Sequence, residues 1–245
     1  RTIAWNVTAR LGDAYVKRYV EERELAILLV VALSASQRWG TRGRMKSELV
    51  AEVVATLAMA AIRNNDRVAL LLVTDEVEWF VPPRKGRRHV LRLVRDLLAF
   101  EPAQRGTDLA AGLDYALRLA PGRSIIFVFS DFRLAPRWDT FAGRLAAATA
   151  RHDVVAVQLT DPLDERLPAV GTIAVQDAES GEIRYIDSSS PSGQQAYQRL
   201  TSADADRARR VFRKHQVDRI ELRTDTPFAG ELQSFFQRRE RRLQR

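Results

Sequence analysis

The sequence predicts an α/β fold in which helices cover both faces of a doubly wound, largely parallel sheet. Residues 25–33 form a continuous apolar run bounded by polar residues, as expected of a central strand buried on both faces. Further runs of this kind recur along the chain, and segments with helical spacing of apolar residues lie between them. Such alternation is typical of parallel strands joined by crossover helices, as in Rossmann-like folds.

The elements follow from apolar spacing and from turn residues. Ile3, Trp5 and Val7 alternate as in a half-buried strand or arm, and Pro82-Pro83 is expected to end an edge strand. We expect strands over about 25–33, 68–73, 76–81, 124–129, 154–159 and 217–222, a small hairpin over 171–175 and 182–186, and helices over about 44–64, 90–98, 109–117, 138–150, 194–215 and 228–245. The predicted organisation is an N-terminal arm over 1–24 and one domain over 25–245, with a C-terminal extension from residue 161.

Composition excludes several classes of protein. The chain of 245 residues has no cysteine, so disulfides, thiol nucleophiles and cysteine-bound zinc are excluded. No apolar run reaches the roughly 20 residues that span a bilayer, and no signal-peptide pattern opens the chain. The chain begins with Arg1 rather than Met, so we expect a fragment whose missing N-terminal segment holds any membrane anchor. The expected location is the cytoplasm, or the cytoplasmic face of the inner membrane if the protein is anchored.

Polar side chains gather where the predicted parallel strands end. Ser34 and Ser36 follow the central strand, Thr107 precedes a helix, and Asp131 follows a third buried strand. The carboxyl ends of strands are where open α/β sheets bind ligands. Hydroxyl and carboxylate oxygens are the ligands that Mg²⁺ prefers, although serines at such positions also cap helices.

These residues resemble the metal-ion-dependent adhesion site of von Willebrand factor A-type domains. In that family, a loop of form Asp-x-Ser-x-Ser, a threonine and a further aspartate hold Mg²⁺ or Mn²⁺, and a partner's carboxylate completes the metal shell. More of the chain resembles the bacterial "domain of unknown function 58" family, which has this A-type fold. The resemblance rests on these segments: 5–10, 16–24, 33–36, 82–86, 130–132, 151–153 and 161–163. It implies a non-enzymatic interaction or scaffold protein that works with a MoxR-type AAA+ ATPase.

Two alanines depart from the family pattern. Ala32 stands where the first-loop aspartate would fall, and Ala4 replaces another acidic residue. The degenerate metal site therefore consists of Ser34, Ser36, Thr107 and Asp131, and we expect weak or absent binding of Mg²⁺ or Mn²⁺ because it has a single carboxylate. Whether these alanines are natural or engineered stays open. We expect the substitution Ala32→Asp to restore a metal site if the loops are otherwise intact.

The expected partner-binding residues are those four together with Arg84 and Lys85, a basic pair suited to an acidic partner surface. One alternative is a hydrolase that uses Ser34 or Asp131 with His89 or His152, but no Gly-x-Ser-x-Gly elbow is present and His152 precedes a strand. Another alternative is nucleic-acid binding, suggested by the net charge of +8 and the basic run 238–242. It is disfavoured because no aromatic residues are interleaved with that run.

Overall fold

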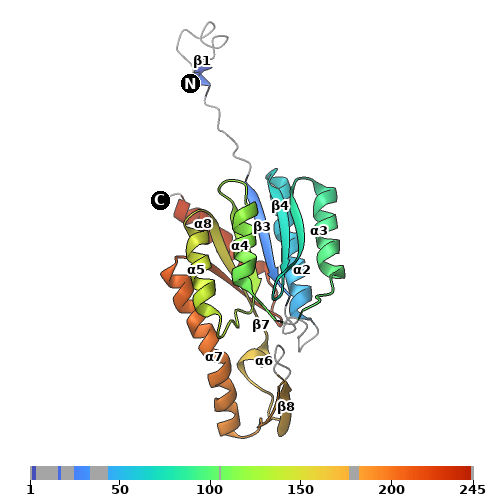
Figure 1. Ribbon diagram of the computed structural model, residues 1–245, viewed down its shortest axis with the longest axis vertical. Helices are drawn as coiled ribbons and strands as arrows, with labels where there is room; N and C mark the ends of the chain where they lie inside the picture. Colours follow the sequence, from blue (N-terminus) through green and yellow to red (C-terminus); the bar gives the residue numbers. More distant parts are fainter. Residues whose placement is uncertain are drawn as a thin grey trace.

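The computed structural model describes residues 2–3, 16–17, 25–33, 44–104, 106–176 and 182–243. Within them a six-stranded sheet has the strand order β10-β7-β6-β3-β4-β5, and helices cover both of its faces (Figure 1). All neighbouring strands are parallel except β5, which pairs antiparallel with β4 at one edge. The strands are β3 (Ala26–Ala32), β4 (Arg67–Val73), β5 (Val77–Arg84), β6 (Ile125–Ser130), β7 (Asp153–Thr160) and β10 (Asp218–Arg223). This topology confirms the predicted doubly wound sheet of the von Willebrand factor A type.

Two helical layers enclose the sheet. One layer packs α2, α3 and α8 against one face, and the other packs α4, α5 and α7 against the opposite face. The helices are α2 (Lys46–Arg63), α3 (Arg87–Ala99), α4 (Leu109–Leu119), α5 (Trp138–Thr149), α6 (Pro162–Glu165), α7 (Pro191–Lys214) and α8 (Ala229–Leu243). Because α7, β10 and α8 contribute to the two cores, the C-terminal part of the chain is packed into the same body as the central strand.

The central strand β3 is buried along its whole length, as its apolar sequence predicts. Ile27, Leu29 and Val31 point into one core, while the alternate residues, ending with Ala32, point into the other. The helix α2, which follows β3, packs on one face of the sheet, and the helix α5, which follows the neighbouring strand β6, packs on the other, so β3 and β6 flank the topological switch point. In doubly wound sheets, ligands bind beyond the carboxyl ends of the strands at this point.

Two elements differ from the expectations. The strand β5 continues through Pro82 and Pro83 to Arg84, whereas the sequence predicted that the prolines would end it. Proline is tolerated there because β5 is an edge strand and one side of it needs no ladder hydrogen bonds. The short helix α6 was not predicted; Asp161 caps it by accepting a hydrogen bond from the backbone N–H of Leu163 at 2.9 Å.

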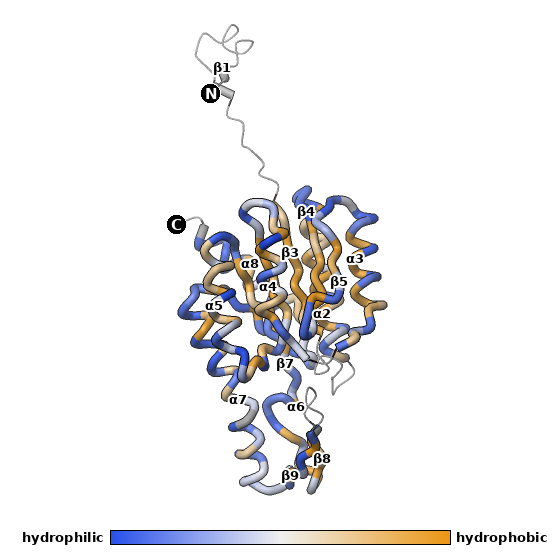
Figure 2. The backbone as a smooth tube through the Cα atoms, in the orientation of Figure 1, coloured by the Kyte–Doolittle hydropathy of each residue, from blue (hydrophilic) through white to orange (hydrophobic). Residues whose placement is uncertain are grey.

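The predicted hairpin is confirmed as β8 (Thr172–Gln176) and β9 (Ile183–Asp187), although the expected turn at Ser180-Gly181 lies outside the described residues. Together with α6 and the first turns of α7, it projects beyond the carboxyl edge of the sheet (Figure 1). Figure 2 shows that the hydrophobic residues concentrate in the sheet, whereas this projection is of mixed hydropathy.

The predicted arm is described only in part. β1 (Thr2–Ile3) pairs antiparallel with β2 (Val16–Lys17), and Ala4, Trp5 and Val7 lie outside the described residues. In the part of the chain that is described, no helix combines the length and the apolar character needed to cross a membrane.

Candidate functional site

The candidate site lies at the carboxyl edge of the sheet, at the switch point between β3 and β6. Asp131 directly follows β6 and is nearly buried, with 8% of its side chain exposed. Thr107 is buried. The backbone N–H of Asp108, the next residue, donates to the carbonyl of Thr74 at 2.6 Å and so holds this segment beside the end of β4. Thus both described members of the predicted site are at this edge. Ser34 and Ser36, which come after β3 in the sequence, lie outside the described residues.

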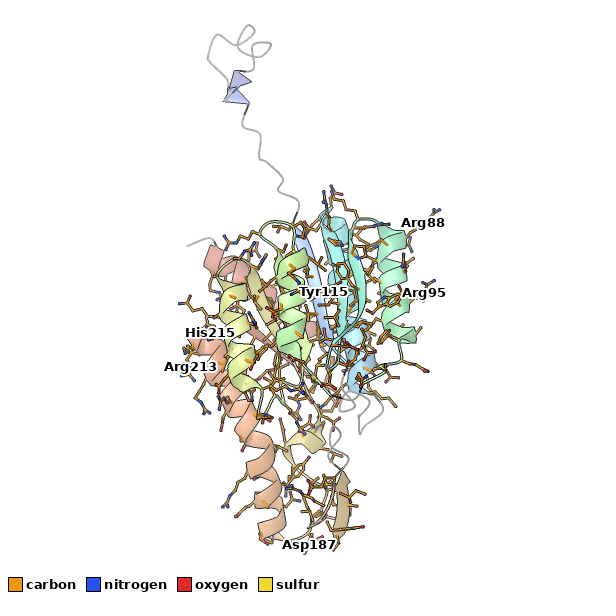
Figure 3. The ribbon with its side chains drawn as sticks, in the orientation of Figure 1. Arg88, Arg95, Tyr115, Asp187, Arg213 and His215 are labelled. Atoms are coloured by element: carbon orange, nitrogen blue, oxygen red, sulfur yellow. The ribbon has the colours of Figure 1, made fainter. Side chains whose placement is uncertain are left out.

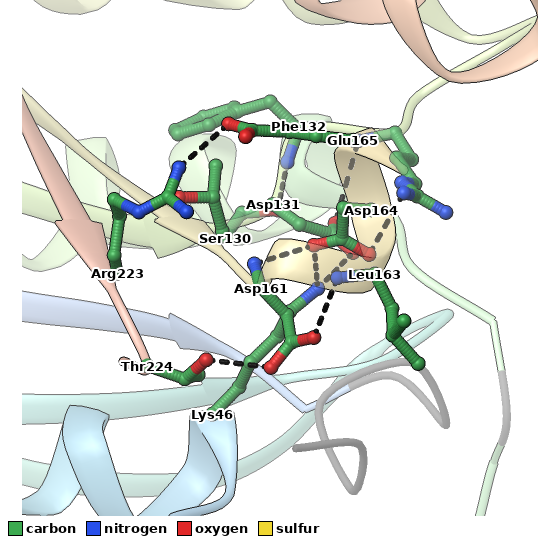
Figure 4. Close-up of polar contacts among 12 residues, drawn as sticks. Lys46, Ser130, Asp131, Phe132, Asp161, Leu163, Asp164, Glu165, Arg223 and Thr224 are labelled. Carbon is green, nitrogen blue, oxygen red and sulfur yellow. Dashed lines mark hydrogen bonds and ion pairs between the residues drawn. The ribbon is translucent and has the colours of Figure 1, made fainter. Parts of the chain in front are cut away.

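A lysine that the sequence analysis did not single out reaches this edge. Lys46 is the first residue of α2, and its side chain is only 1% exposed. Its Nζ atom lies 2.7 Å from Asp164 Oδ2 and 3.7 Å from Asp131 Oδ2 (Figure 4). Lysine is almost never fully buried unless it is paired, and here two carboxylates provide the pairing.

Asp164, in α6, is the centre of a small charged network. Its Oδ1 atom accepts a hydrogen bond from Arg133 Nη2 at 2.9 Å, while Oδ2 accepts one from the backbone N–H of Asp161 at 2.8 Å. Burial by itself would lower the pKa of Arg133, but the carboxylates of Asp164 and Asp131 raise it above its usual value. Arg133 therefore remains a cation beside the two carboxylates.

The neighbouring strand β10 is tied to the same network. The hydroxyl of Thr224, just after β10, donates to Asp161 Oδ2 at 2.5 Å in a buried bond. Arg223 donates to Glu165 Oε1 at 2.8 Å and to Asp225 Oδ1 at 3.0 Å, and this guanidinium lowers the pKa of Asp225. The connections after β6, β7 and β10 thus form one hydrogen-bonded platform.

A cleft of about 650 Å³ opens over this platform, and α7 and the start of α8 form part of its wall. Its lining carries both signs of charge. The lining residues are Asp131, Arg133, Gln158, Leu159, Thr160, Asp164, Glu165, Gln198, Thr201, Ser202, Asp204, Ala205, Arg209, Arg219, Glu221, Arg223, Thr226 and Glu231. A cleft so lined suits a polar or charged segment rather than an apolar ligand.

The region around Thr107 is held by a second set of hydrogen bonds. Arg137 donates to the carbonyl of Thr107 at 3.0 Å and to Asp75 Oδ1 at 3.1 Å. Asp108 caps α4 by accepting from the N–H of Ala111 at 3.0 Å. These contacts hold the loop around Thr107, which is neither helix nor strand, in a defined position beside β4.

The basic pair Arg84 and Lys85 is not part of this edge. Arg84 pairs with Val68, near the start of β4, and therefore lies at the amino end of the parallel strands. Figure 3 shows Arg88, in the helix that follows, far from Asp187 in the projection beyond the carboxyl edge. The two halves of the predicted partner-binding set are thus on opposite edges of the sheet.

The chain's three histidines also lie away from the crevice. His89 contacts the carbonyl of Val68 at 2.8 Å, His152 contacts the N–H of Ser124 at 3.3 Å, and His215 caps the end of α7. All of these contacts lie at the amino edge of the sheet. Leu33 lies at the carboxyl edge, about 20 Å away, because a strand of this length spans that distance. This geometry disfavours a hydrolase in which Ser34 and His89 or His152 act together.

We expect His152 to make stability depend on pH. Burial, with a smaller contribution from Arg151, lowers the pKa of His152 below its usual value of about 6.5. Below about pH 6.5 the imidazole of His152 binds a proton more readily in the unfolded chain than in the folded protein. The folded protein should thus be most stable above about pH 6.5 and lose stability as pH falls through the lowered pKa.

Urea unfolding between about pH 5 and pH 8 tests this expectation. His152→Gln should flatten the pH dependence in this range, whereas Gln195→Asn, at an exposed position without a titrating group, serves as the control and should leave it unchanged. An unaltered pH slope in His152→Gln would show that the buried imidazole is not its source.

The basic run near the C-terminus is partly used in internal ion pairs. Arg239 pairs with Asp153, at the start of β7, and Arg242 donates to Asp218 Oδ1 at 2.7 Å, at the start of β10. These pairs attach α8 to the sheet, so part of the positive charge proposed for nucleic acid is already neutralised.

The described residues do not fit a divalent metal ion. The buried methyl group of Ala32 supplies no oxygen ligand, and an ammonium lies beside the carboxylate of Asp131. Across the described ranges, no group of three or more histidine, aspartate or glutamate side chains is arranged to hold a metal ion. Weak or absent metal binding stays a prediction, to which Lys46 adds a physical reason.

Sequence reasoning missed Lys46, Arg133 and Asp164. A signal for Lys46 was present, since it precedes Leu49 and Val53 at the helical spacing that defines the inner face of α2. A lysine on that face needs a buried counter-ion. The identity of the counter-ions depended on α6, which the sequence did not predict.

Comparison with known proteins assigns the chain to a protein family. The family described as "Protein of unknown function DUF58" matches residues 1–208. The chain belongs to this family. An uncharacterized protein of Mycobacterium tuberculosis is 31% identical over 243 residues, which cover 98% of this chain and 75% of the relative.

Solved structures agree on the fold. The conserved hypothetical protein BatB of Bacteroides thetaiotaomicron superposes with a TM-score of 0.57 at 13% identity, covering 88% of this chain and 98% of that one. An aerotolerance-related membrane protein of Bacteroides fragilis gives a TM-score of 0.54 at 13% identity, covering 87% and 97%. At such identities the similarity concerns the fold alone.

Proposed function

We propose that this member of the family is a non-enzymatic interaction module whose partner-binding surface is the cleft at the carboxyl edge of the sheet. The observation that carries the proposal is how the carboxylates at this edge are used. Asp131, Asp161 and Asp164 are engaged by protein cations or by N–H and O–H donors. Carboxylates held in this way are poor general bases, and a nucleophile activated by histidine would need a base that lies at the other edge.

The cleft offers the features of a recognition surface. Its floor is a fixed network of charges, and its wall on α7 presents exposed polar side chains, among them Gln198, Ser202 and Arg209. We propose that a charged segment of a partner protein binds here by shape, hydrogen bonds and ion pairs, with no metal ion between the two proteins. Charges of both signs along the cleft would select the partner more than they would add to the affinity.

The partner that we propose is a MoxR-type AAA+ ATPase on the cytoplasmic side of the membrane. The support for this partner is the resemblance to a family whose members are often encoded beside such ATPases. Arg84 and Lys85 would form a second, separate contact at the amino edge, suited to an acidic surface of the same partner.

Binding to a purified MoxR-type ATPase from the same organism, measured by surface plasmon resonance, tests the proposal. We expect Ser202→Trp, which fills the cleft from α7, to weaken binding at least about tenfold, or 1.4 kcal/mol. The matched control is Gln195→Trp, at another exposed position on α7 that does not line the cleft.

The proposal fails if Ser202→Trp binds as the unaltered protein does while Arg88→Glu, at the amino edge, abolishes binding. That pattern would assign recognition to the basic segment instead. Absence of binding by the unaltered protein would exclude the ATPase as the partner.

A further inference from the structure

We propose that the ammonium group of Lys46 occupies the cation position of the carboxyl-edge site and excludes divalent metal ions from it. The inference deepens the proposed function, because it explains how the crevice would bind a partner without a metal. Its test reads metal binding and the state of Lys46 directly, so it succeeds or fails independently of any partner.

The position of Lys46 is the first argument. The side chain starts at the first turn of α2, after the connection that leaves β3, and its ammonium reaches the connections that follow β6 and β7. These connections meet at the switch point, where an ion bound by this edge would lie. The ammonium group therefore links the start of α2 to the connections after β6 and β7, as a metal ion bound at this position would.

The contacts of the ammonium are the second argument. Nζ lies 2.7 Å from one carboxylate, that of Asp164, and 3.7 Å from another, that of Asp131, with the lysine side chain 1% exposed (Figure 4). An ammonium carries three donors and no acceptor, so it is suited to sit among oxygen atoms as a small cation does. Unlike an ion, it cannot dissociate.

The cations already present beside Asp131 and Asp164 are the third argument. Lys46 and Arg133 already face Asp131 and Asp164 with two positive charges, while the neighbouring carboxylate of Asp161 is taken up by the N–H of Leu163 and the hydroxyl of Thr224. A divalent ion bound to Asp131 would lie next to the buried ammonium of Lys46 and would be repelled by it. The alanine at position 32 is consistent with a bound ammonium, because a single positive charge needs fewer carboxylates around it than a divalent ion does.

Two consequences follow. The three connections are held together whether or not Mg²⁺ is present, so the crevice keeps its shape at any metal concentration. The substitution Ala32→Asp alone supplies a ligand but leaves the competing ammonium in place. Restoring a metal site should therefore require a change at both positions.

Calorimetric titration with MgCl₂ and with MnCl₂ tests the inference on four proteins: unaltered, Ala32→Asp, Lys46→Met, and the double variant. We expect no binding heat from the unaltered protein, and affinity in the double variant at least about 100-fold higher than in Ala32→Asp. Lys214→Met, at an exposed lysine at the end of α7, is the matched control and should bind no metal. The inference is overturned if Ala32→Asp binds as tightly as the double variant, or if the double variant with intact circular dichroism binds no metal.

A second measurement uses the unaltered protein and does not depend on how the variants fold. In a proton–nitrogen correlation spectrum of the lysine ammonium groups, Lys46 should give a signal protected from solvent exchange, because the group is buried and ion-paired. Millimolar Mg²⁺ should leave that signal in place. Its absence, or its loss on addition of Mg²⁺, would contradict the inference.

Discussion

Replacing Lys46 with methionine is expected to lower the free energy of unfolding by about 3–5 kcal/mol, the cost of removing one partner of a buried ion pair. Methionine preserves most of the volume of the lysine side chain, so the loss reflects charge rather than a cavity. It leaves the carboxylate of Asp131, 8% exposed, without the cation that faces it at 3.7 Å. It also takes the 2.7 Å ion pair from Asp164.

Asp164 moderates this loss because it keeps a second cation. Arg133 Nη2 lies 2.9 Å from its other oxygen, and 21% of the Asp164 side chain is exposed to water. A fully buried carboxylate with a single partner would suffer more. We therefore expect a value in the lower half of the range, and a larger part of it to arise at Asp131.

Urea unfolding followed by circular dichroism measures the effect, with Lys214→Met as the control, expected to stay within about 0.5 kcal/mol of the unaltered protein. A double-mutant cycle with Asp164→Asn should return a coupling energy of about 1–3 kcal/mol between positions 46 and 164. A stability change in Lys46→Met no greater than in the control would show that the ammonium is not held in a buried pair.

Much of the fold could be predicted because it depends on local pattern. The apolar run of β3 indicated a central strand, and the helical spacing in α2 placed Leu49 and Val53 against it. The order of strands and helices predicted a doubly wound sheet and placed Thr107 and Asp131 where its elements meet; the structure has both residues at the carboxyl edge. The family resemblance added the A-type topology, which the strand order confirms.

The charged network could not be predicted, because it depends on contacts between residues far apart in the sequence. Lys46, Arg133 and Asp164 come from three different connections, and no local spacing relates them. The position of Arg84 could not be predicted either. Its charge placed it among the expected partner-binding residues, and the antiparallel direction of β5 carries it to the edge of the sheet opposite the crevice.

Replacing Phe132 with alanine is expected to lower the free energy of unfolding by about 3–5 kcal/mol, as for other large-to-small changes at fully buried aromatic positions. The Phe132 side chain is 0% exposed, and its ring lies 4.9 Å from that of Phe212 in α7 and 6.1 Å from that of Phe141 in α5. It therefore joins the loop that carries Asp131 and Arg133 to two helices of the same layer.

The backbone at Phe132 provides a sharper test of this explanation. Its φ of 55° is in the left-handed region, which costs a residue with a side chain about 1–2 kcal/mol. Burial of the ring outweighs that cost, which explains why a bulky residue stands where glycine would be comfortable. Once the ring is gone, glycine should be the better replacement, so Phe132→Gly should be less destabilising than Phe132→Ala by about 1 kcal/mol.

Thermal and urea unfolding of both variants, compared with Phe236→Ala at a position that is 44% exposed, would measure these differences. The control should lose about 1 kcal/mol or less, because truncating a half-exposed ring removes little buried surface. Equal losses at positions 132 and 236 would refute the packing role of Phe132. If Phe132→Ala were instead more stable than Phe132→Gly, the loop after β6 would have relaxed out of the left-handed conformation on loss of the ring. Asp131 and Arg133 would then lose their fixed positions at the floor of the cleft, and partner binding should weaken together with stability.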